Sequence, residues 1–159
     1  MTPQHSAGHF APPSEPDRNP PLPAEEARRM EDKQGPPRVL VVEDDFLIAM
    51  QTEIALTAAG FEVVGPATTA EEAVALAGEA QPVLAVMDIR LASTRDGIDA
   101  ARQLYQDFAI RCIFATAHDD ARTRGRAEPY APLGWLPKPY TMASLVAVVA
   151  EAVAELRRP

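Results

Sequence analysis

Apolar and polar positions along residues 38–158 follow a pattern that predicts five strands, each followed by a helix. Short apolar runs rich in β-branched residues are typical of strands that are buried on both faces of a sheet. Stretches with apolar residues at helical spacing, bounded by capping residues or glycine, are typical of helices. The predicted strands are 38–42, 61–67, 83–88, 111–116 and 134–137, and the predicted helices are 46–59, 70–79, 97–107, 119–127 and 141–158.

The first and last predicted helices each begin at or directly after a residue whose side chain can cap a helix. Asp45 and Thr141 each precede a helix, and their side-chain oxygens are of the kind that accepts hydrogen bonds from a first helical turn. Arg157 and Arg158 are expected in the last turn of the final helix, where positive charge is favoured.

The strict alternation of strands and helices predicts an α/β fold. Parallel strands need crossover connections, and right-handed crossovers place helices on both faces of the sheet. Such sheets bind ligands at the carboxyl ends of their strands. We therefore expect the functional side chains directly after the strands.

The first 37 residues differ in composition from the rest of the chain. They hold nine of the 16 prolines and only isolated apolar residues, among them Phe10, Leu22 and Met30. A segment of this kind buries too little apolar surface to offset its ordering entropy, so residues 1–37 are predicted to form a disordered tail. Two alternatives stay open: Met30 is the true start of the protein, or the tail binds a partner.

Length and charge exclude several classes of function. At 159 residues the chain has room for one ordinary domain, so a second catalytic domain is not expected. A net charge of −8 argues against a nucleic-acid-binding protein. The single cysteine, Cys112, excludes an internal disulfide bond and fits a reducing compartment. No apolar run approaches the ~20 residues of a membrane span. A cytoplasmic protein is expected.

Charged or hydroxyl side chains stand at the ends of four of the predicted strands. Glu43 and Asp44 follow the first strand, Asp88 ends the third, Thr116 ends the fourth and Lys138 follows the fifth. Clustered carboxylates repel one another unless they share a cation, and oxygen ligands favour Mg²⁺. Lys138 is the only lysine of the predicted domain. An aspartate beside Mg²⁺, a lysine and a hydroxyl is equipped to attack phosphorus and to hold an acyl phosphate.

Four motifs in order carry a resemblance to a known family. VLVVEDD, VMDIRL followed by DG, FATA and LPKPY resemble the receiver domain of bacterial two-component response regulators of the CheY-like, stand-alone type. The resemblance covers about residues 38–158. It implies a flavodoxin-like (βα)5 fold with strand order 2-1-3-4-5.

The resemblance also implies a role for each matching residue. Asp88 matches the phosphoacceptor, Lys138 the family's lysine and Thr116 the switch hydroxyl. The implied Mg²⁺ ligands are Asp44, Glu43, Asp88 and the backbone carbonyl of Arg90. The remaining matches are Trp135 at the aromatic switch position, Pro139 after a cis peptide bond, and Arg90 and His118 at the two positions that tune dephosphorylation.

The sequence departs from the family pattern at two places near these residues. Trp135 is larger than the usual tyrosine or phenylalanine, and it could serve packing alone. The segment from Asp88 to Gly97 is one residue longer than in common members and lacks their proline.

Several charged or reactive residues also have ordinary structural interpretations. Cys112 is expected to be a small core residue, and His118 a solvated loop residue. Arg122, Arg124 and Arg126 are expected to form a solvated helix face, with docking of an acidic partner as the alternative.

The leading hypothesis for function is a phosphoacceptor switch rather than an enzyme. A sensor histidine kinase or a histidine phosphotransfer protein would donate the phosphoryl group. The signal would leave by contact with an unknown downstream protein, or the chain would act as a phosphate sink. A homodimer through the fourth helix, fifth strand and fifth helix is a further possibility. The competing hypotheses are a binding module that no longer uses phosphorylation, a phosphatase with an aspartate nucleophile, and a DNA-binding regulator.

Overall fold

The computed structural model describes residues 35–117 and 119–159. The predicted tail falls almost wholly on residues 1–34 and therefore lies outside the described residues, as does His118. The strands are β1 (Arg38–Val42), β2 (Glu62–Ala67), β3 (Leu84–Asp88), β4 (Cys112–Thr116) and β5 (Gly134–Pro137). The helices are α2 (Phe46–Ala58), α3 (Ala70–Ala80), α4 (Gly97–Phe108), α5 (Ala121–Ala127), the 3₁₀ helix η1 (Glu128–Tyr130) and α6 (Met142–Leu156).

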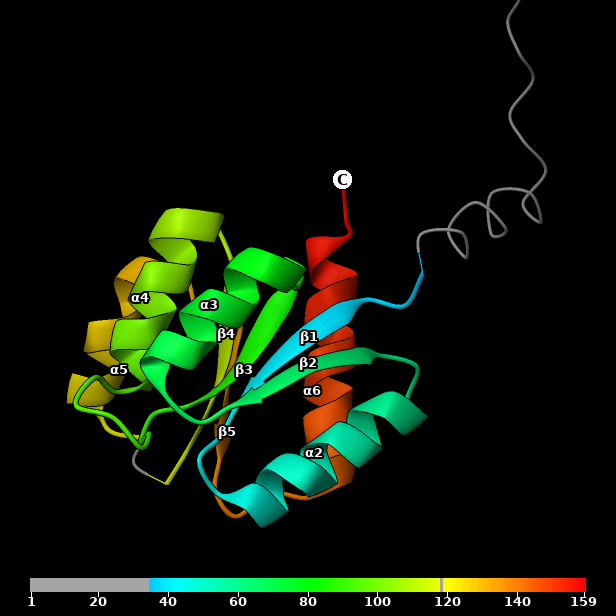
Figure 1. Cartoon of the computed structure of the whole chain (residues 1–159), viewed down its shortest axis with the longest axis horizontal. Helices are drawn as coiled ribbons and strands as arrows, with labels where there is room; N and C mark the ends of the chain where they lie inside the picture. Colours follow the sequence, from blue (N-terminus) through cyan, green and yellow to red (C-terminus); the bar gives the residue numbers. More distant parts are fainter. Residues whose placement is uncertain (1–34, 118) are drawn as a thin grey trace, which may run out of the picture. The chain divides into compact units, whose positions relative to one another are not determined.

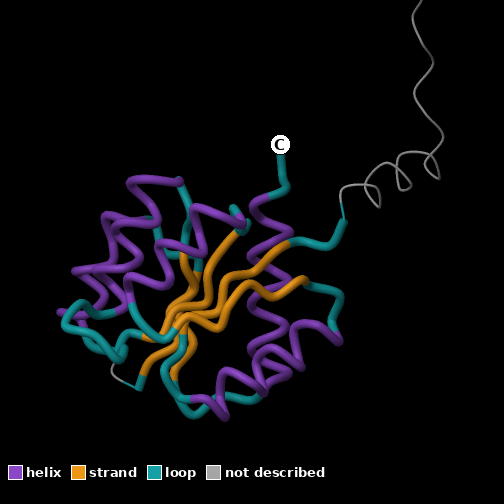
Figure 2. The backbone as a smooth tube through the Cα atoms, viewed as in Figure 1, coloured by secondary structure: helices purple, strands orange, loops and turns teal. Residues whose placement is uncertain are grey.

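The five strands form one parallel sheet in the order β2-β1-β3-β4-β5. Helices α3, α4 and α5 cover one face of the sheet, and α2 and α6 cover the other (Figure 1). Figure 2 shows the strands running side by side between these two layers. The predicted α/β, flavodoxin-like fold with strand order 2-1-3-4-5 is confirmed.

Alternate residues of each strand face the two helical layers. In β1, Leu40 and Val42 belong to the core beneath α3 and α4, whereas Val39 and Val41 belong to the core beneath α2 and α6. Because both faces are buried, the strand reads as a continuous apolar run. Cys112 is buried in the first of these cores, as expected of a small apolar residue.

The predicted caps are present where the helices begin. The Asp45 side chain accepts hydrogen bonds from the backbone N–H groups of Leu47 and Ile48, at 3.0 and 3.1 Å. The Thr141 hydroxyl accepts one from the N–H of Ser144 at 3.1 Å. These bonds satisfy N–H groups that have no partner within a first helical turn.

The last two helices differ from the sequence-based prediction: α6 ends two residues early, and α5, which ends at Ala127 as predicted, begins two residues late. Helix α6 ends at Leu156, so its last turn holds no basic residue and the arginines follow it. Pro159 disfavours helical backbone at Arg158, the residue directly before it, so the helix cannot extend to the end of the chain. Helix α5 gives way to the 3₁₀ turn η1, in which Pro129 occupies a first-turn position that needs no N–H donor. No helix in the described part of the chain is long and apolar enough to cross a bilayer.

Candidate functional site

Strand register brings the predicted residues to one end of the sheet. Val42 of β1 pairs with Met87 of β3, so the next residues along, Glu43 and Asp88, are neighbours. On the other side of β3, Asp88 pairs with Ala115 of β4, which places Thr116 one residue further along. The sheet therefore assembles these side chains from segments that are far apart in the sequence.

Lys138 lies between the two buried carboxylates. Its Nζ is 3.3 Å from Glu43 Oε2 and 3.3 Å from Asp88 Oδ2. The carboxylate side chains are only 6% and 9% exposed. The backbone N–H of Lys138 donates to the carbonyl oxygen of Thr116 at 2.8 Å, which fixes the lysine backbone against the end of β4. The lysine thus joins three of the strand ends, and the peptide bond that links it to Pro139 is cis.

Three carboxylates lie close enough to share one cation. One oxygen each of Glu43, Asp44 and Asp88 lies within 4.8 Å of the others. Asp44 is exposed whereas the other two are buried, so the cluster opens to solvent on one side. The backbone N–H of Arg90 donates to Asp88 Oδ1 at 3.3 Å, which brings the Arg90 backbone next to the same carboxylate. An all-oxygen set of this kind fits a hard divalent cation such as Mg²⁺.

The electrostatics of the cluster follow from burial and crowding. Burial and the nearby Asp88 charge raise the pKa of Glu43 from 4.5 to about 7, against the opposing effect of its hydrogen bond from Asp45 N–H and of Lys138. Burial by itself lowers the pKa of Lys138, but the charges of Asp88 and Glu43 outweigh burial and raise it. Lys138 therefore stays charged at neutral pH, while Glu43 without a cation holds its proton until near neutrality.

This arrangement predicts that the metal-free chain becomes less stable as the pH rises from about 4.5 to about 7. The folded state holds the Glu43 proton more tightly than the unfolded state, so stability is fully present below pH 4.5 and falls up to the folded pKa. Because the cluster opens to solvent beside Asp44, we expect a loss of about 1–2 kcal/mol, less than the full shift implies. Urea unfolding in EDTA across this range measures it. In Glu43→Gln the free energy of unfolding should no longer fall across this pH range. An equally steep fall of the free energy of unfolding in that variant would contradict the explanation.

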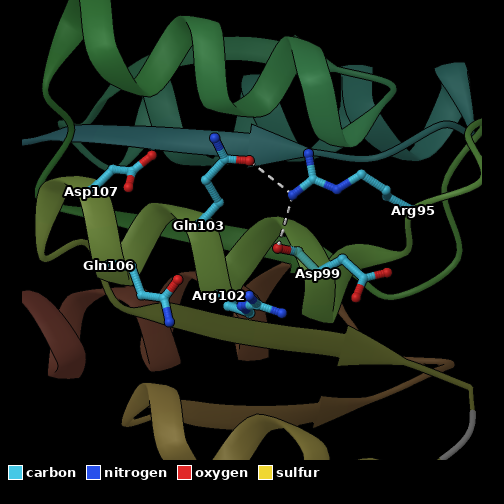
Figure 3. A pocket seen from close by; sticks show the side chains of 6 residues that line it. All are labelled: Arg95, Asp99, Arg102, Gln103, Gln106 and Asp107. Carbon is cyan, nitrogen blue, oxygen red and sulfur yellow. Dashed lines mark hydrogen bonds between the residues drawn. The ribbon is translucent and has the colours of Figure 1, made fainter.

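The segment after Asp88 is held in place by backbone contacts and by one arginine. Gly97 N–H donates to the carbonyl oxygen of Ile89 at 2.7 Å, and a Cβ on Gly97 would lie 1.9 Å from the carbonyl oxygen of Asp88. Figure 3 shows Arg95 reaching over α4 to Gln103 Oε1, at 2.8 Å, and to the backbone oxygen of Asp99, at 3.3 Å. The segment between Asp88 and Gly97 is thus tied to α4.

Two hollows of about 410 Å³ lie on the described surface. The one in Figure 3 runs along the polar face of α4 and includes none of the clustered carboxylates. The other borders Lys138 and is largely apolar, with Ile48, Ala117, Pro139 and Tyr140 among its walls. Burial raises the pKa of Tyr140. The second hollow adjoins the cluster and belongs to the same site.

Trp135 packs on the α5 side of the sheet, three residues before Lys138. Its indole stacks on the ring of Phe114, with centroids 4.9 Å apart and planes at 26°. The guanidinium of Arg124 lies over the indole, 5.0 Å from the ring centroid. Thr116, at the end of the neighbouring strand, is 4% exposed. The aromatic residue thus lies on the strand next to the one that carries the hydroxyl.

The three arginines of α5 are exposed, as predicted for a solvated face, and two of them also form ion pairs. Arg124 forms a two-pronged ion pair with Asp119, and Arg126 Nη1 lies 2.8 Å from Asp96 Oδ2. The sequence gives no sign of these pairs because each depends on how α5 is oriented toward its neighbours. Gly97 was also missed as a site residue, although its Asp-Gly motif is visible in the sequence.

Comparisons with known proteins agree with this geometry. Residues 39–150 match the family model described as the response regulator receiver domain. The transcriptional regulatory protein PdtaR of Mycobacterium tuberculosis is 34% identical over 126 residues, which are 79% of this chain and 61% of PdtaR. The phyllosphere-induced regulator PhyR of Methylorubrum extorquens is 36% identical over 116 residues, which are 72% of this chain and 43% of PhyR. The chain therefore matches less than two thirds of either relative.

A solved structure gives the same result at the level of the fold. The signal receiver domain of a modulated diguanylate cyclase from Desulfovibrio desulfuricans superposes with a TM-score of 0.70 at 34% identity. The superposition covers 77% of this chain and 97% of that domain.

Proposed function

The chain belongs to the response regulator receiver family, and from that premise we propose that it accepts a phosphoryl group on Asp88 from a sensor histidine kinase or a histidine phosphotransfer protein. One observation carries the proposal: the buried Asp88 carboxylate lies 3.3 Å from Lys138 Nζ and within 4.8 Å of two further carboxylates. This places a nucleophilic oxygen, a fixed positive charge and a set of cation ligands together.

The proposed transfer balances as a simple displacement at phosphorus. An Asp88 carboxylate oxygen attacks the phosphorus and forms a P–O bond, while the P–N bond to the donor histidine breaks. The electron pair of that bond stays on the imidazole nitrogen, which then takes up a proton. In a separate hydrolysis step, a water oxygen attacks the phosphorus while the P–O bond to Asp88 breaks, which releases inorganic phosphate and restores the carboxylate. In this proposal the chain accepts and hydrolyses its own phosphoryl group and is not an enzyme acting on other substrates.

The neighbouring groups have separate roles in this proposal. Asp44, Glu43, Asp88 and the Arg90 carbonyl would hold Mg²⁺, which stabilises charge on the phosphoryl oxygens when it is bound. Lys138 supplies a second, permanent positive charge to the phosphoryl group. The Thr116 hydroxyl moves toward the phosphoryl group and donates a hydrogen bond to one of its oxygens. This movement shifts the segment that follows β4 from its unphosphorylated to its phosphorylated conformation.

Partner proteins are proposed on both sides of the switch. The start of α2 follows the acidic residues Glu43 and Asp44 closely, and its Phe46 and Leu47 are 74% and 62% exposed, so we propose that the donor contacts it. Exposed apolar side chains grouped in this way are typical of protein contact surfaces. We propose that the signal leaves through the face made by α5, β5 and α6, to a downstream protein or a second copy of this chain, unless the chain serves as a phosphate sink. The proposed setting is the cytoplasm.

The experiment uses the full chain with acetyl phosphate as a small donor, read by intact-mass spectrometry. With Mg²⁺ we expect the wild-type chain to gain the mass of one phosphoryl group, and with EDTA we expect none. Asp88→Asn should gain none in either condition. Asp107→Asn, on the exposed part of α4, is the matched control and should behave as wild type.

Two results would overturn the proposal. A folded wild-type chain that gains no mass with Mg²⁺ would favour the alternative of a binding module that works without phosphorylation. Equal labelling of Asp88→Asn would move the acceptor to another residue. Continuous hydrolysis of phosphomonoesters would instead favour the phosphatase alternative.

A further inference from the structure

Helix α2 exposes more large apolar side chains than any other element in the described part of the chain. Eight such residues are exposed among the described residues, and four of them lie on this helix: Phe46, Leu47, Met50 and Ile54. Among its 13 residues Glu53 is the only charged one. A surface helix normally carries charged and polar residues on its outer side, and a grouped apolar surface is typical of a contact with another molecule.

The exposed residues form a row along the outer side of α2. Phe46, Met50 and Ile54 follow one another at intervals of four residues, which places them on one side of the helix. Leu47 lies beside this row, three residues before Met50. In the first turn, Phe46 and Leu47 are 74% and 62% exposed, so the beginning of the helix presents two bulky side chains to solvent.

The second half of the same helix is hollowed instead. An open hollow of about 540 Å³ lies there, lined by Met50, Glu53, Ile54, Thr57 and Ala58. Thr57 and Ala58 have small side chains, which leaves space beside the larger ones. One half of α2 thus carries exposed bulky residues, and the other half has room for them.

The two halves match when two copies of the helix pack antiparallel. The first half of each helix then lies over the second half of the other. A two-fold axis near Met50 places Phe46 and Leu47 of each copy opposite the hollow of its partner, so the same fit is made twice. Rows at a spacing of four residues interdigitate in the commonest class of helix packing, and that class needs such a row on both helices.

Charge also favours a second copy at this face. The chain has a net charge of −8, so two copies repel each other in general. At α2 each copy contributes only the charge of Glu53, so this repulsion is small there. A helix of 13 residues is about 20 Å long. One such helix from each partner makes a small interface, which predicts a reversible dimer with a dissociation constant in the micromolar range.

We propose that the chain forms a symmetric dimer in which the α2 helices of two copies pack antiparallel through the row from Phe46 to Ile54. This face differs from the face of α5, β5 and α6 that we propose for output. The start of α2 is also the proposed donor contact, so the dimer is proposed for the chain without its donor. It does not depend on phosphorylation of Asp88.

Sedimentation equilibrium of the full chain, without Mg²⁺ or phosphodonor, measures the association. The wild-type mass should rise from that of one chain toward that of two between about 1 µM and about 300 µM. Met50→Lys places a charge at the two-fold axis in both copies and should weaken association by about 30-fold or more. Ala75→Lys is the matched control, because it makes the same kind of change on the exposed side of α3 and should associate as the wild type does.

Cysteine cross-linking locates the interface independently of these variants. Cys112, the only cysteine of the chain, is buried in the core and should not react. Under mild oxidation Met50→Cys should form a disulfide-linked dimer, because the two copies of this residue meet at the two-fold axis. Glu151→Cys should stay monomeric. Glu151 lies on α6 three residues after Val148, which faces Gly134 of β5, so it reports on the proposed output face.

Three results would overturn the proposal. The first is a wild-type chain that stays monomeric over the whole concentration range. The second is a folded Met50→Lys variant that associates as strongly as the wild type. The third is cross-linking of Glu151→Cys without cross-linking of Met50→Cys, which would move the interface to the output face. Failure of the proposed phosphorylation would show separately, as a missing mass gain with acetyl phosphate.

Discussion

Replacing Gly97 by alanine is expected to disable the site without touching any of its side chains. The added Cβ would lie 1.9 Å from the carbonyl oxygen of Asp88 and 2.8 Å from Ile89 Cα, so the backbone that carries the acceptor must move. Both obstacles are backbone atoms that no side-chain rotation can clear. Overpacking of this kind costs about 1–3 kcal/mol and sometimes more, and we expect about 3 kcal/mol here. Urea unfolding measures the loss, and labelling by acetyl phosphate should fall at least tenfold, by about the factor that a poorly placed reacting group costs.

Gly125→Ala is the matched control for that substitution. Gly125 lies in α5, and a Cβ there meets nothing within 4 Å. Alanine should therefore stabilise the helix by about 0.5–1 kcal/mol and leave labelling unchanged. A Gly97→Ala variant that is as stable and as readily labelled as wild type would show that the close approach to Asp88 does not constrain the site.

Replacing Lys138 by methionine should slow the phosphorylation of Asp88. It should also make the thermal stability of the chain depend more strongly on a bound cation. The methionine keeps the apolar stem but removes the charge that lies 3.3 Å from both Glu43 and Asp88. Removing one fixed group that stabilises charge in a transition state slows a reaction by about 100-fold or more. Because Lys138 is partly exposed, we expect the labelling rate to fall by about 10–100-fold. The labelling rate with acetyl phosphate at saturating Mg²⁺ measures it.

A second readout separates this electrostatic role from a packing role. Without Lys138 the two carboxylates lose their counter-charge, so added Mg²⁺ should raise the melting temperature more in Lys138→Met than in the wild type. Lys138→Arg keeps the charge and should respond to Mg²⁺ as the wild type does. A labelling rate within about twofold of wild type, far from the loss expected for a charge-stabilising donor, would contradict the role given to Lys138.

Much of the fold could be predicted from the sequence because the three central strands are buried on both faces. The run RVLVV coincides with β1, and the partly buried edge strand GWLP coincides with β5. Parallel pairing then brings the residues that follow the strands to one end of the sheet, which is why Glu43, Asp88 and Lys138 could be grouped from the sequence alone. Chain order and strand type are enough for this step.

Contacts that depend on helix orientation and close packing could not be predicted in the same way. Arg124 and Arg126 look alike in the sequence, yet one covers Trp135 and the other binds the N-cap of α4. Gly97 belongs to a visible Asp-Gly motif, but its need for hydrogen in place of a side chain follows only from the path of the Asp88 backbone. The raised pKa of Glu43 likewise depends on how deeply the side chain is buried.

The most direct test of the central claim locates the phosphoryl group on the chain. An aspartyl phosphate is an acyl phosphate, and borohydride reduces it to the alcohol, which converts the labelled aspartate to homoserine. Peptide mass spectrometry after labelling with acetyl phosphate and Mg²⁺ should find homoserine at position 88 of the wild-type chain. Aspartate should persist at positions 44 and 45, and omission of Mg²⁺ should leave all three as aspartate. Homoserine at another position, or none in a chain that has gained phosphoryl mass, would contradict the assignment of Asp88 as the acceptor.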